Sequence, residues 1–284
     1  MLIVRRAPAS AHLRPVVSSF TERKGHFREM SRMRPLPARP EQILEIYLAE
    51  CYRVKRSDAG FGLSPDAAVV GPMTEPRVEL GFVGEIETFT IHFRPTGLSR
   101  LFGVPMDTLA NDAGAVSDVL GELGRRLVDN VRRAPSFAQR VEIAEAWTRQ
   151  LLADARAANA VDHVASLLAA EHGHHDVRAL ARRADLSSRQ LQRRFVDQVG
   201  VAPKLYARLC RIAGVIQARN AAPSRTMTDL AYDFGYADQA HLTREFRTLS
   251  GRNPVDFFRA AAAVPETETS PGVRFVQARQ LARR

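Results

Sequence analysis

Cysteine is scarce in this 284-residue chain, which has only Cys51 and Cys210. The two lie far apart, and neither belongs to a CxxC or cysteine/histidine spacing, so we expect neither a disulfide framework nor a zinc site. No run of residues approaches the roughly 18 consecutive apolar positions that a membrane-spanning helix needs. The first residues, MLIVRRAPASAHL, lack the continuous apolar segment of a secretory signal. The sequence therefore predicts a cytoplasmic protein with no membrane partner.

Motifs typical of enzymes are also missing. The chain has no Walker loop, no nucleophile elbow and no HExxH motif. His172, His174 and His175 stand close together in EHGHHD, but adjacent histidines before a helix are more often an exposed turn than a metal site. No acidic or cysteine ligand set joins them in the sequence. We expect no catalytic residues, no metal, no cofactor and no enzymatic activity.

Charge is unevenly distributed around a net value of +10. Lys and Arg outnumber Asp and Glu by 9 to 2 in residues 1–40, by 15 to 8 in residues 176–259 and by 4 to 2 from 260, whereas residues 41–175 have 13 against 19. A basic C-terminal block beside an acidic body indicates that one domain meets a polyanion. Genome bias toward arginine is the alternative, and charge alone does not decide between them.

The length allows two domains, since domains commonly run from about 100 to 200 residues. Residues 1–34 combine scattered arginines and prolines with few periodic apolar positions and are predicted to be a disordered basic extension. Met30 and Met33 come just before the first clear pattern, so a start there is an alternative to a functional basic arm that starts at Met1. Residues 262–284 are predicted to be a disordered tail.

Residues 35–150 are predicted to form a mixed, partly β domain. The segment EQILEIYLAECYRV from residue 41 is strongly apolar, and its pattern does not distinguish helix from strand. In ETFTIHFRP, apolar and polar residues alternate, which predicts a half-buried strand. Its two faces are Phe89, Ile91 and Phe93 against Thr88, Thr90 and His92. After Pro95 the spacing of apolar residues becomes helical, and we expect Phe89, Phe93 and Phe102 in a core.

The C-terminal region, residues 160–261, contains an internal repeat and is predicted to be all α, so the fold class is α+β. A shift of 51 residues aligns Leu191, Arg193, Phe195, Gly200, Pro203 and Tyr206 with Leu242, Arg244, Phe246, Gly251, Pro254 and Phe257. Upstream, Leu180 and Ala181 align with Leu230 and Ala231 at a shift of 50. The second copy therefore has one extra residue in its turn.

Each copy has the pattern of a helix-turn-helix. In the first unit, a short helix with Leu180 on its apolar side must stop near Asp185, and Ser187 is a candidate N-cap of the next helix. Leu191 and Phe195 then point inward. The outward positions are Ser188, Arg189, Gln192 and Arg193.

The second unit repeats this plan. Gly235 suits a left-handed turn residue, Asp238 caps the next helix, and Leu242 and Phe246 are buried. The outward positions are Gln239, Ala240, Thr243 and Arg244, with His241 and Arg247 at the margins. Arg and Gln on an outward face suit the major groove, where Arg reads guanine and Gln reads adenine. A single such face is more often merely solvated, but the duplicated turn, cap, core pair and basic face favour DNA binding.

The segments LSSRQLQRRFVDQVGVAPKLYARLCRI and DLAYDFGYADQAHLTREFRTLSGRNPVDFFR resemble the two helix-turn-helix units of the AraC/XylS family of bacterial regulators. The resemblance implies two recognition helices, joined by a linking helix at 203–221, that enter successive major grooves. By position it implies groove contacts from the eight outward residues named above. Phosphate contacts are expected from Arg194, Lys204, Arg208, His241 and Arg247.

The resemblance implies a sequence-specific DNA-binding transcriptional regulator whose partner is promoter or operator DNA. RNA polymerase, a small-molecule effector and a second copy of the chain are further candidate partners. The N-terminal domain would sense an effector or dimerise, and VVGPMTEP and HFRPTGLSRLFGVP resemble an uncharacterised domain of some such regulators. The alternatives are a small-molecule sensor or interaction protein with a degenerate DNA-binding domain, and an enzyme with a fused DNA-binding tail. Effector, target sequence, activation or repression, and oligomeric state stay open.

Overall fold

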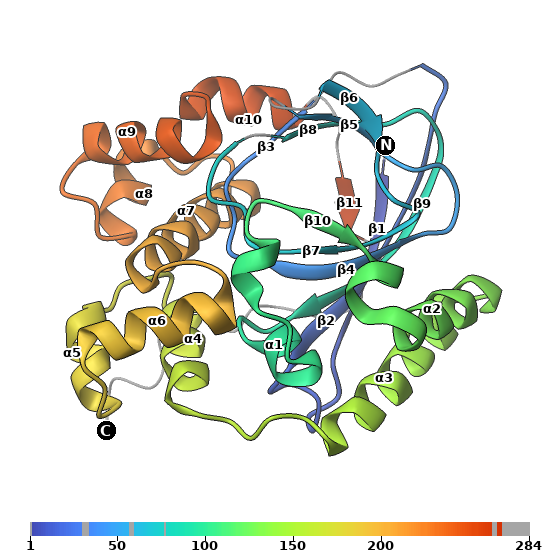
Figure 1. The fold of residues 1–284 in the computed structure, drawn as a ribbon. Helices are drawn as coiled ribbons and strands as arrows, with labels where there is room; N and C mark the ends of the chain where they lie inside the picture. The colour runs from blue at the N-terminus through green and yellow to red at the C-terminus, as the bar shows by residue number, and fades with distance from the viewer. Residues whose placement is uncertain (1, 30–33, 57–59, 77, 263–265, 269–284) are drawn as a thin grey trace.

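The computed structural model describes residues 2–29, 34–56, 60–76, 78–262 and 266–268. Two β-sheets and the helices that flank them form the N-terminal part, and further helices form the C-terminal part beside it (Figure 1). The predicted α+β class, with a partly β domain followed by an all-α domain, is confirmed. No helix in the described ranges has the length and apolar character to cross a membrane.

A seven-stranded sheet is the centre of the N-terminal domain. Its strand order is β10-β7-β4-β9-β2-β1-β11, and its neighbours pair antiparallel except β1 with β11. The strands are β1 (Leu2–Pro8), β2 (Val17–Phe27), β4 (Gln42–Tyr47), β7 (Ala67–Val70), β9 (Gly84–Phe93), β10 (Ala113–Ala115) and β11 (Glu266–Glu268). A smaller antiparallel sheet, in the order β3-β8-β5-β6, contains β3 (Arg34–Leu36), β5 (Arg53–Arg56), β6 (Gly60–Leu63) and β8 (Val78–Gly81).

The prediction that residues 1–34 are a disordered extension was wrong. β2 pairs with β9 along its whole length and lies inside the large sheet, and its Val17 and Phe20 are fully buried. The strand is hard to see in the sequence because charged residues of β2 pair with partners on other elements. Glu22, for example, accepts hydrogen bonds from Arg5 and from Arg140 of a later helix. A chain that began at Met30 or Met33 would lack β1 and β2.

The expected tail at 262–284 lies largely outside the described residues. Within it Glu266–Glu268 is a strand, β11, that pairs in parallel with β1.

The ambiguous segment from residue 41 is a strand, β4, and the alternating segment is β9. β9 is buried on both faces, so the expected half-burial was wrong. Thr88 and Thr90 are fully buried because the face that they share is turned toward the smaller sheet, where Tyr47 of β4 packs edge-on against Tyr52 with 4.9 Å between ring centroids.

Helices cover the other face of the large sheet. They are α1 (Gly97–Phe102), the 3-10 helix η1 (Met106–Leu109), α2 (Val116–Arg133) and α3 (Phe137–Ala153). Phe89 and Phe93 belong to the core between the sheet and these helices, as expected, and Phe102 packs against Trp147 at its edge.

The C-terminal helices share one core of their own. They are α4 (Ala160–Ala170), α5 (Val177–Arg183), α6 (Ser188–Val199), α7 (Pro203–Ala221), α8 (Met227–Asp233), α9 (Gln239–Ser250) and α10 (Pro254–Ala262). α7 has the bounds predicted for the linking helix. It buries residues from Pro203 to Val215, among them Tyr206 and Ile212, in the core that it shares with both helix-turn-helix units.

A buried carboxylate, Asp162 of α4, joins the two domains. It accepts hydrogen bonds from Thr96 of the N-terminal domain at 2.5 Å and from Arg156 at 3.0 Å, and Arg100 lies 3.7 Å away. Burial alone would raise the pKa of Asp162, but the hydrogen bonds from Arg156 and Thr96 outweigh it and hold the pKa below its ordinary value. The charge of Asp162 therefore stabilises the folded protein.

We expect Asp162→Ala to lower the free energy of unfolding by about 3 kcal/mol at neutral pH, because two arginines lose their buried counter-charge. Since the pKa is lower in the folded than in the unfolded chain, this stabilisation is complete above about pH 4 and is lost as the pH falls through the folded value. Urea unfolding of the wild type and the variant between pH 7 and pH 3 measures the loss of stability and its dependence on pH. Asp129→Ala, which removes an exposed partner of Arg133, is the control and should cost less than about 1 kcal/mol. Equal costs for the two variants would contradict the assignment.

Candidate DNA-binding surface

The first helix-turn-helix consists of α5, a tight turn and α6. The turn contains Asp185 in the left-handed region at φ 52° and leads to Ser187. The Ser187 hydroxyl accepts a hydrogen bond from the Gln190 backbone N–H at 3.2 Å, and the Gln190 side chain accepts one from the Ser187 N–H at 2.9 Å. This capping box satisfies two free donors of α6 and confirms Ser187 as its N-cap.

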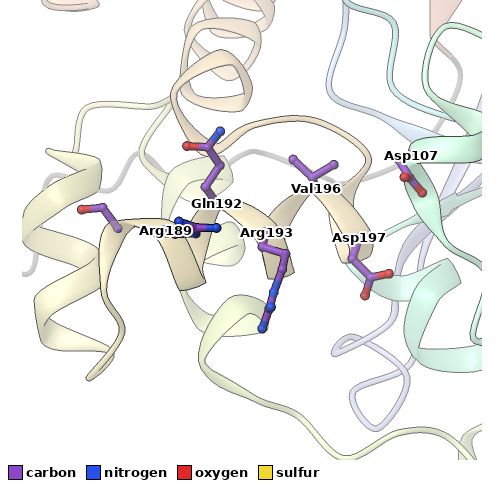
Figure 2. A pocket seen from close by; sticks show the side chains of 7 residues that line it. Asp107, Arg189, Gln192, Arg193, Val196 and Asp197 are labelled. Carbon is purple, nitrogen blue, oxygen red and sulfur yellow. The ribbon is translucent and has the colours of Figure 1, made fainter.

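The two faces of α6 separate as the sequence predicts. Leu191 and Phe195 are buried, and the Phe195 ring contacts Tyr206 of α7 edge-on, with 5.5 Å between centroids. The predicted outward residues are all exposed: Ser188, Arg189, Gln192 and Arg193. They line an open groove of about 710 Å³, in which Arg189 and Arg193 stand beside Gln192 (Figure 2).

The second unit consists of α8, its turn and α9. Gly235 lies in the left-handed region at φ 67°, and Asp238 accepts a hydrogen bond from the His241 backbone N–H at 2.6 Å, so both predictions are confirmed. Leu242 and Phe246 are fully buried. The turn of this unit is one residue longer than that of the first. Leu242 and Phe246 nevertheless take the buried positions on α9 that Leu191 and Phe195 take on α6.

The outward face of α9 is less charged than that of α6. Gln239, Ala240 and Arg244 are exposed, and Thr243 is half-buried. The Thr243 hydroxyl donates to the backbone oxygen of Gln239 at 2.8 Å. The side-chain oxygen of Gln239 accepts a hydrogen bond from Thr228 of α8 at 2.9 Å.

The predicted phosphate-contact residues divide into two groups. Arg194 on α6, Lys204 at the start of α7 and Arg247 on α9 are exposed. Arg208 donates to the largely buried Glu245 of α9 at 3.2 Å, and His241 packs edge-on against Tyr236. These last two residues hold the second unit together, so less of their donor capacity is directed to solvent.

Contacts with the N-terminal domain, which the sequence did not indicate, hold the C-terminal ends of both recognition helices. Gln42 of β4 donates to the backbone oxygen of Val199 in α6 at 3.3 Å, and the Ala38 N–H donates to the backbone oxygen of Leu249 in α9 at 2.7 Å. Asp107 of η1 borders the groove on α6 (Figure 2). The partners are more than a hundred residues apart in the chain, so no local pattern announces them.

Each recognition helix ends at a glycine, Gly200 or Gly251, in the left-handed region. A Cβ at Gly200 would lie 2.7 Å from the backbone oxygen of Met106, and one at Gly251 would lie 3.2 Å from Pro76. Both glycines therefore allow the helix to turn and the N-terminal domain to approach closely.

The histidine-rich turn is only partly exposed, which corrects one expectation. His172 packs edge-on against Phe234 of α8, with 5.4 Å between centroids, and burial lowers its pKa. His174 is exposed, and His175 lies 3.1 Å from Glu171. In the part of the chain that the structure describes, no three possible metal ligands cluster. The turn helps to dock the second unit.

Two family models match the chain. Residues 180–260 match a helix-turn-helix domain, and residues 5–114 match a domain of unknown function. The second match begins inside the segment that the sequence suggested was an extension, in agreement with β1 and β2 in the sheet. No curated protein matches the sequence.

Solved structures with a similar arrangement include ToxT from Vibrio cholerae, at 10% identity and a TM-score of 0.47 over 86% of this chain and 97% of ToxT. A structure of ToxT bound to an unsaturated fatty acid has 9% identity and a TM-score of 0.47 over 89% and 97% of the two chains. The AraC-like transcriptional activator CuxR has 12% identity and a TM-score of 0.25 over 78% and 83%.

We expect Ser187→Ala to lower the free energy of unfolding by about 1 kcal/mol, because the first turn of α6 loses its capping hydroxyl. Equilibrium urea unfolding measures the effect. Ser188→Ala, one residue further and exposed, removes the same hydroxyl group without removing the cap, and should change stability by less than about 0.5 kcal/mol. If the two variants unfolded at the same urea concentration, the cap would contribute nothing.

Proposed function

We propose that this chain, which belongs to the AraC/XylS family through the helix-turn-helix domain at residues 180–260, is a sequence-specific DNA-binding transcriptional regulator. The observation that carries the proposal is the pair of exposed faces on α6 and α9, each held by a capped turn, a buried apolar pair and a shared core with α7. One chain thus offers two recognition helices. Successive major grooves, about 34 Å apart, are their expected sites.

The charge of its exposed face favours α6 as the helix that contributes more to base recognition. Arg189 and Arg193 present two guanidinium groups in one groove with Gln192 between them, and guanidinium groups make the commonest specific contact with guanine. On α9 only Arg244 has this chemistry among the four outward positions. A sensor with a decayed DNA-binding domain would not need to keep both caps and both outward faces, so those features favour the regulator.

A second function, binding of an anionic small molecule, is favoured by the inner face of the large sheet, which we define as the face turned toward the smaller sheet. Arg6, Thr21 and Thr90 are in register there, as are Arg23 and Thr88. Burial, with the charges of Arg23, Arg6 and Arg39, lowers the pKa of His92 to about 3, so this ring is neutral at physiological pH.

Two buried polar atoms near this inner face, Arg39 Nε and Thr88 Oγ1, have no hydrogen-bond partner among the described residues. Buried polar groups normally have partners, so a ligand oxygen is a natural acceptor for them. The guanidinium group of Arg39 favours an anionic ligand, a carboxylate or a phosphate. Such a ligand would act as the effector that regulates DNA binding.

We expect Arg193→Ala to weaken binding to the specific DNA site by about 1–3 kcal/mol and to relax base preference at one position, because it removes a donor to base edges. Titration of specific and random duplexes at fixed salt measures the loss. Arg133→Ala removes the same charge from an exposed site on α2 and is the control. Equal losses on the two duplexes would refute base reading by Arg193.

We expect citrate or inorganic phosphate to raise the thermal unfolding midpoint of the full chain at constant ionic strength, while glucose leaves it unchanged. A ligand at 100 times its dissociation constant stabilises the folded state by about 2.7 kcal/mol, enough for a shift of several degrees. Thr88→Val should abolish the shift because it removes the buried hydroxyl without changing volume. If an anion still raised the midpoint of Thr88→Val, the anion would bind at another site. If no anion raised the midpoint of the wild type, the proposed anion binding would be refuted.

A further inference from the structure

Two exposed side chains of the second unit are joined across its helices. Thr228 lies on α8, the helix that precedes the turn, and its hydroxyl donates to the side-chain oxygen of Gln239 at 2.9 Å. Gln239 is the first residue of α9 and one of the outward positions. In the first unit the repeat places Arg178 and Ser188 at these two positions, so the pair is particular to the second unit.

The hydrogen bond sets the chemistry that Gln239 offers. A glutamine side chain reads adenine by using both ends of its carboxamide, the oxygen as acceptor from N6 and the nitrogen as donor to N7. When the oxygen is held by Thr228, the amide nitrogen lies on the opposite side of the carboxamide. The oxygen keeps a second lone pair, but its bond with Thr228 fixes the carboxamide against α8, so the group is not free to turn both ends toward N6 and N7 of one adenine. The amide N–H groups still donate, and guanine N7 and O6 or thymine O4 accept them.

The neighbours of Gln239 have the same bias. The Thr243 hydroxyl donates its proton to the Gln239 backbone oxygen at 2.8 Å, so that proton is not offered to a base. Ala240 is exposed and has only a methyl group to offer. Methyl groups in the major groove contact the C5 methyl of thymine.

We propose that Thr228 is a positioning residue that sets the base preference of the second unit by fixing the carboxamide of Gln239. The half-site read by α9 then has guanine, with its two acceptors, or thymine, whose methyl group Ala240 can contact, in preference to adenine, which offers only N7 to a donor. This inference rests on the proposed DNA-binding function and deepens it, since it names bases that the second unit selects.

Selection of bound oligonucleotides from a random duplex library, with the full chain at fixed salt, tests the inference. Gln239→Ala identifies the base position by erasing its preference. Thr228→Val keeps the side-chain volume and removes the donor. We expect the preference of that position for guanine or thymine over adenine to fall about tenfold, because the released oxygen can accept from adenine N6. Thr228→Ser restores the hydroxyl and should keep the wild-type preference.

The thermal midpoint of Thr228→Val should match that of the wild type because the side chain is exposed, which separates base preference from folding. An unchanged motif in Thr228→Val, or the same altered motif in Thr228→Ser, would overturn the role of Thr228 and leave the proposed function intact. A wild-type chain that enriches no motif would overturn both.

Discussion

The attachment of both recognition helices to the N-terminal domain is the constraint on which the DNA-binding geometry depends. In the last turn of α6, the backbone oxygen of Val199 accepts a hydrogen bond from the Gln42 side chain. In the last turn of α9, the backbone oxygen of Leu249 accepts one from the Ala38 N–H. These bonds satisfy carbonyl groups that a helix end leaves free. A helix tethered at its C-terminal end by another domain points its N-terminal residues at the DNA from a fixed direction.

Charge at the boundary reinforces this direction. Asp107 and Asp197 border the C-terminal part of the α6 groove, whereas Arg189 and Arg193 occupy the part nearer its N-terminus. The helix dipole adds positive potential at the N-terminal end and negative potential at the other. The N-terminal part of α6 therefore favours a phosphate group more than its C-terminal part does.

The two helix-turn-helix units could be predicted in detail because their determinants are local. Ser187, Asp238 and Gly235 act within four residues of where they stand, and inward pairs four apart follow from helical periodicity. The strands near the N-terminus could not be predicted, since the charged residues of β2 are balanced by distant partners such as Arg140. Burial of Thr88 likewise depends on a second sheet whose strands lie elsewhere in the chain. Helical periodicity also predicted which residues of α6 and α9 face outward, although Thr243 is half-buried, and their contact with DNA stays a prediction. The bond between Thr228 and Gln239 depends on the angle between α8 and α9, which periodicity does not determine.

The paired glycine ends of α6 and α9 have a further consequence. Gly200 and Gly251 both lie against the N-terminal domain, and α7 shares one core with both units, so these contacts oppose movement of one recognition helix relative to the other. Under the proposed function, a duplex whose two half-sites lie slightly out of phase would have to twist or bend to meet both helices, at a cost that depends on the base steps between them. Bases that no side chain touches would thereby contribute to the choice of operator.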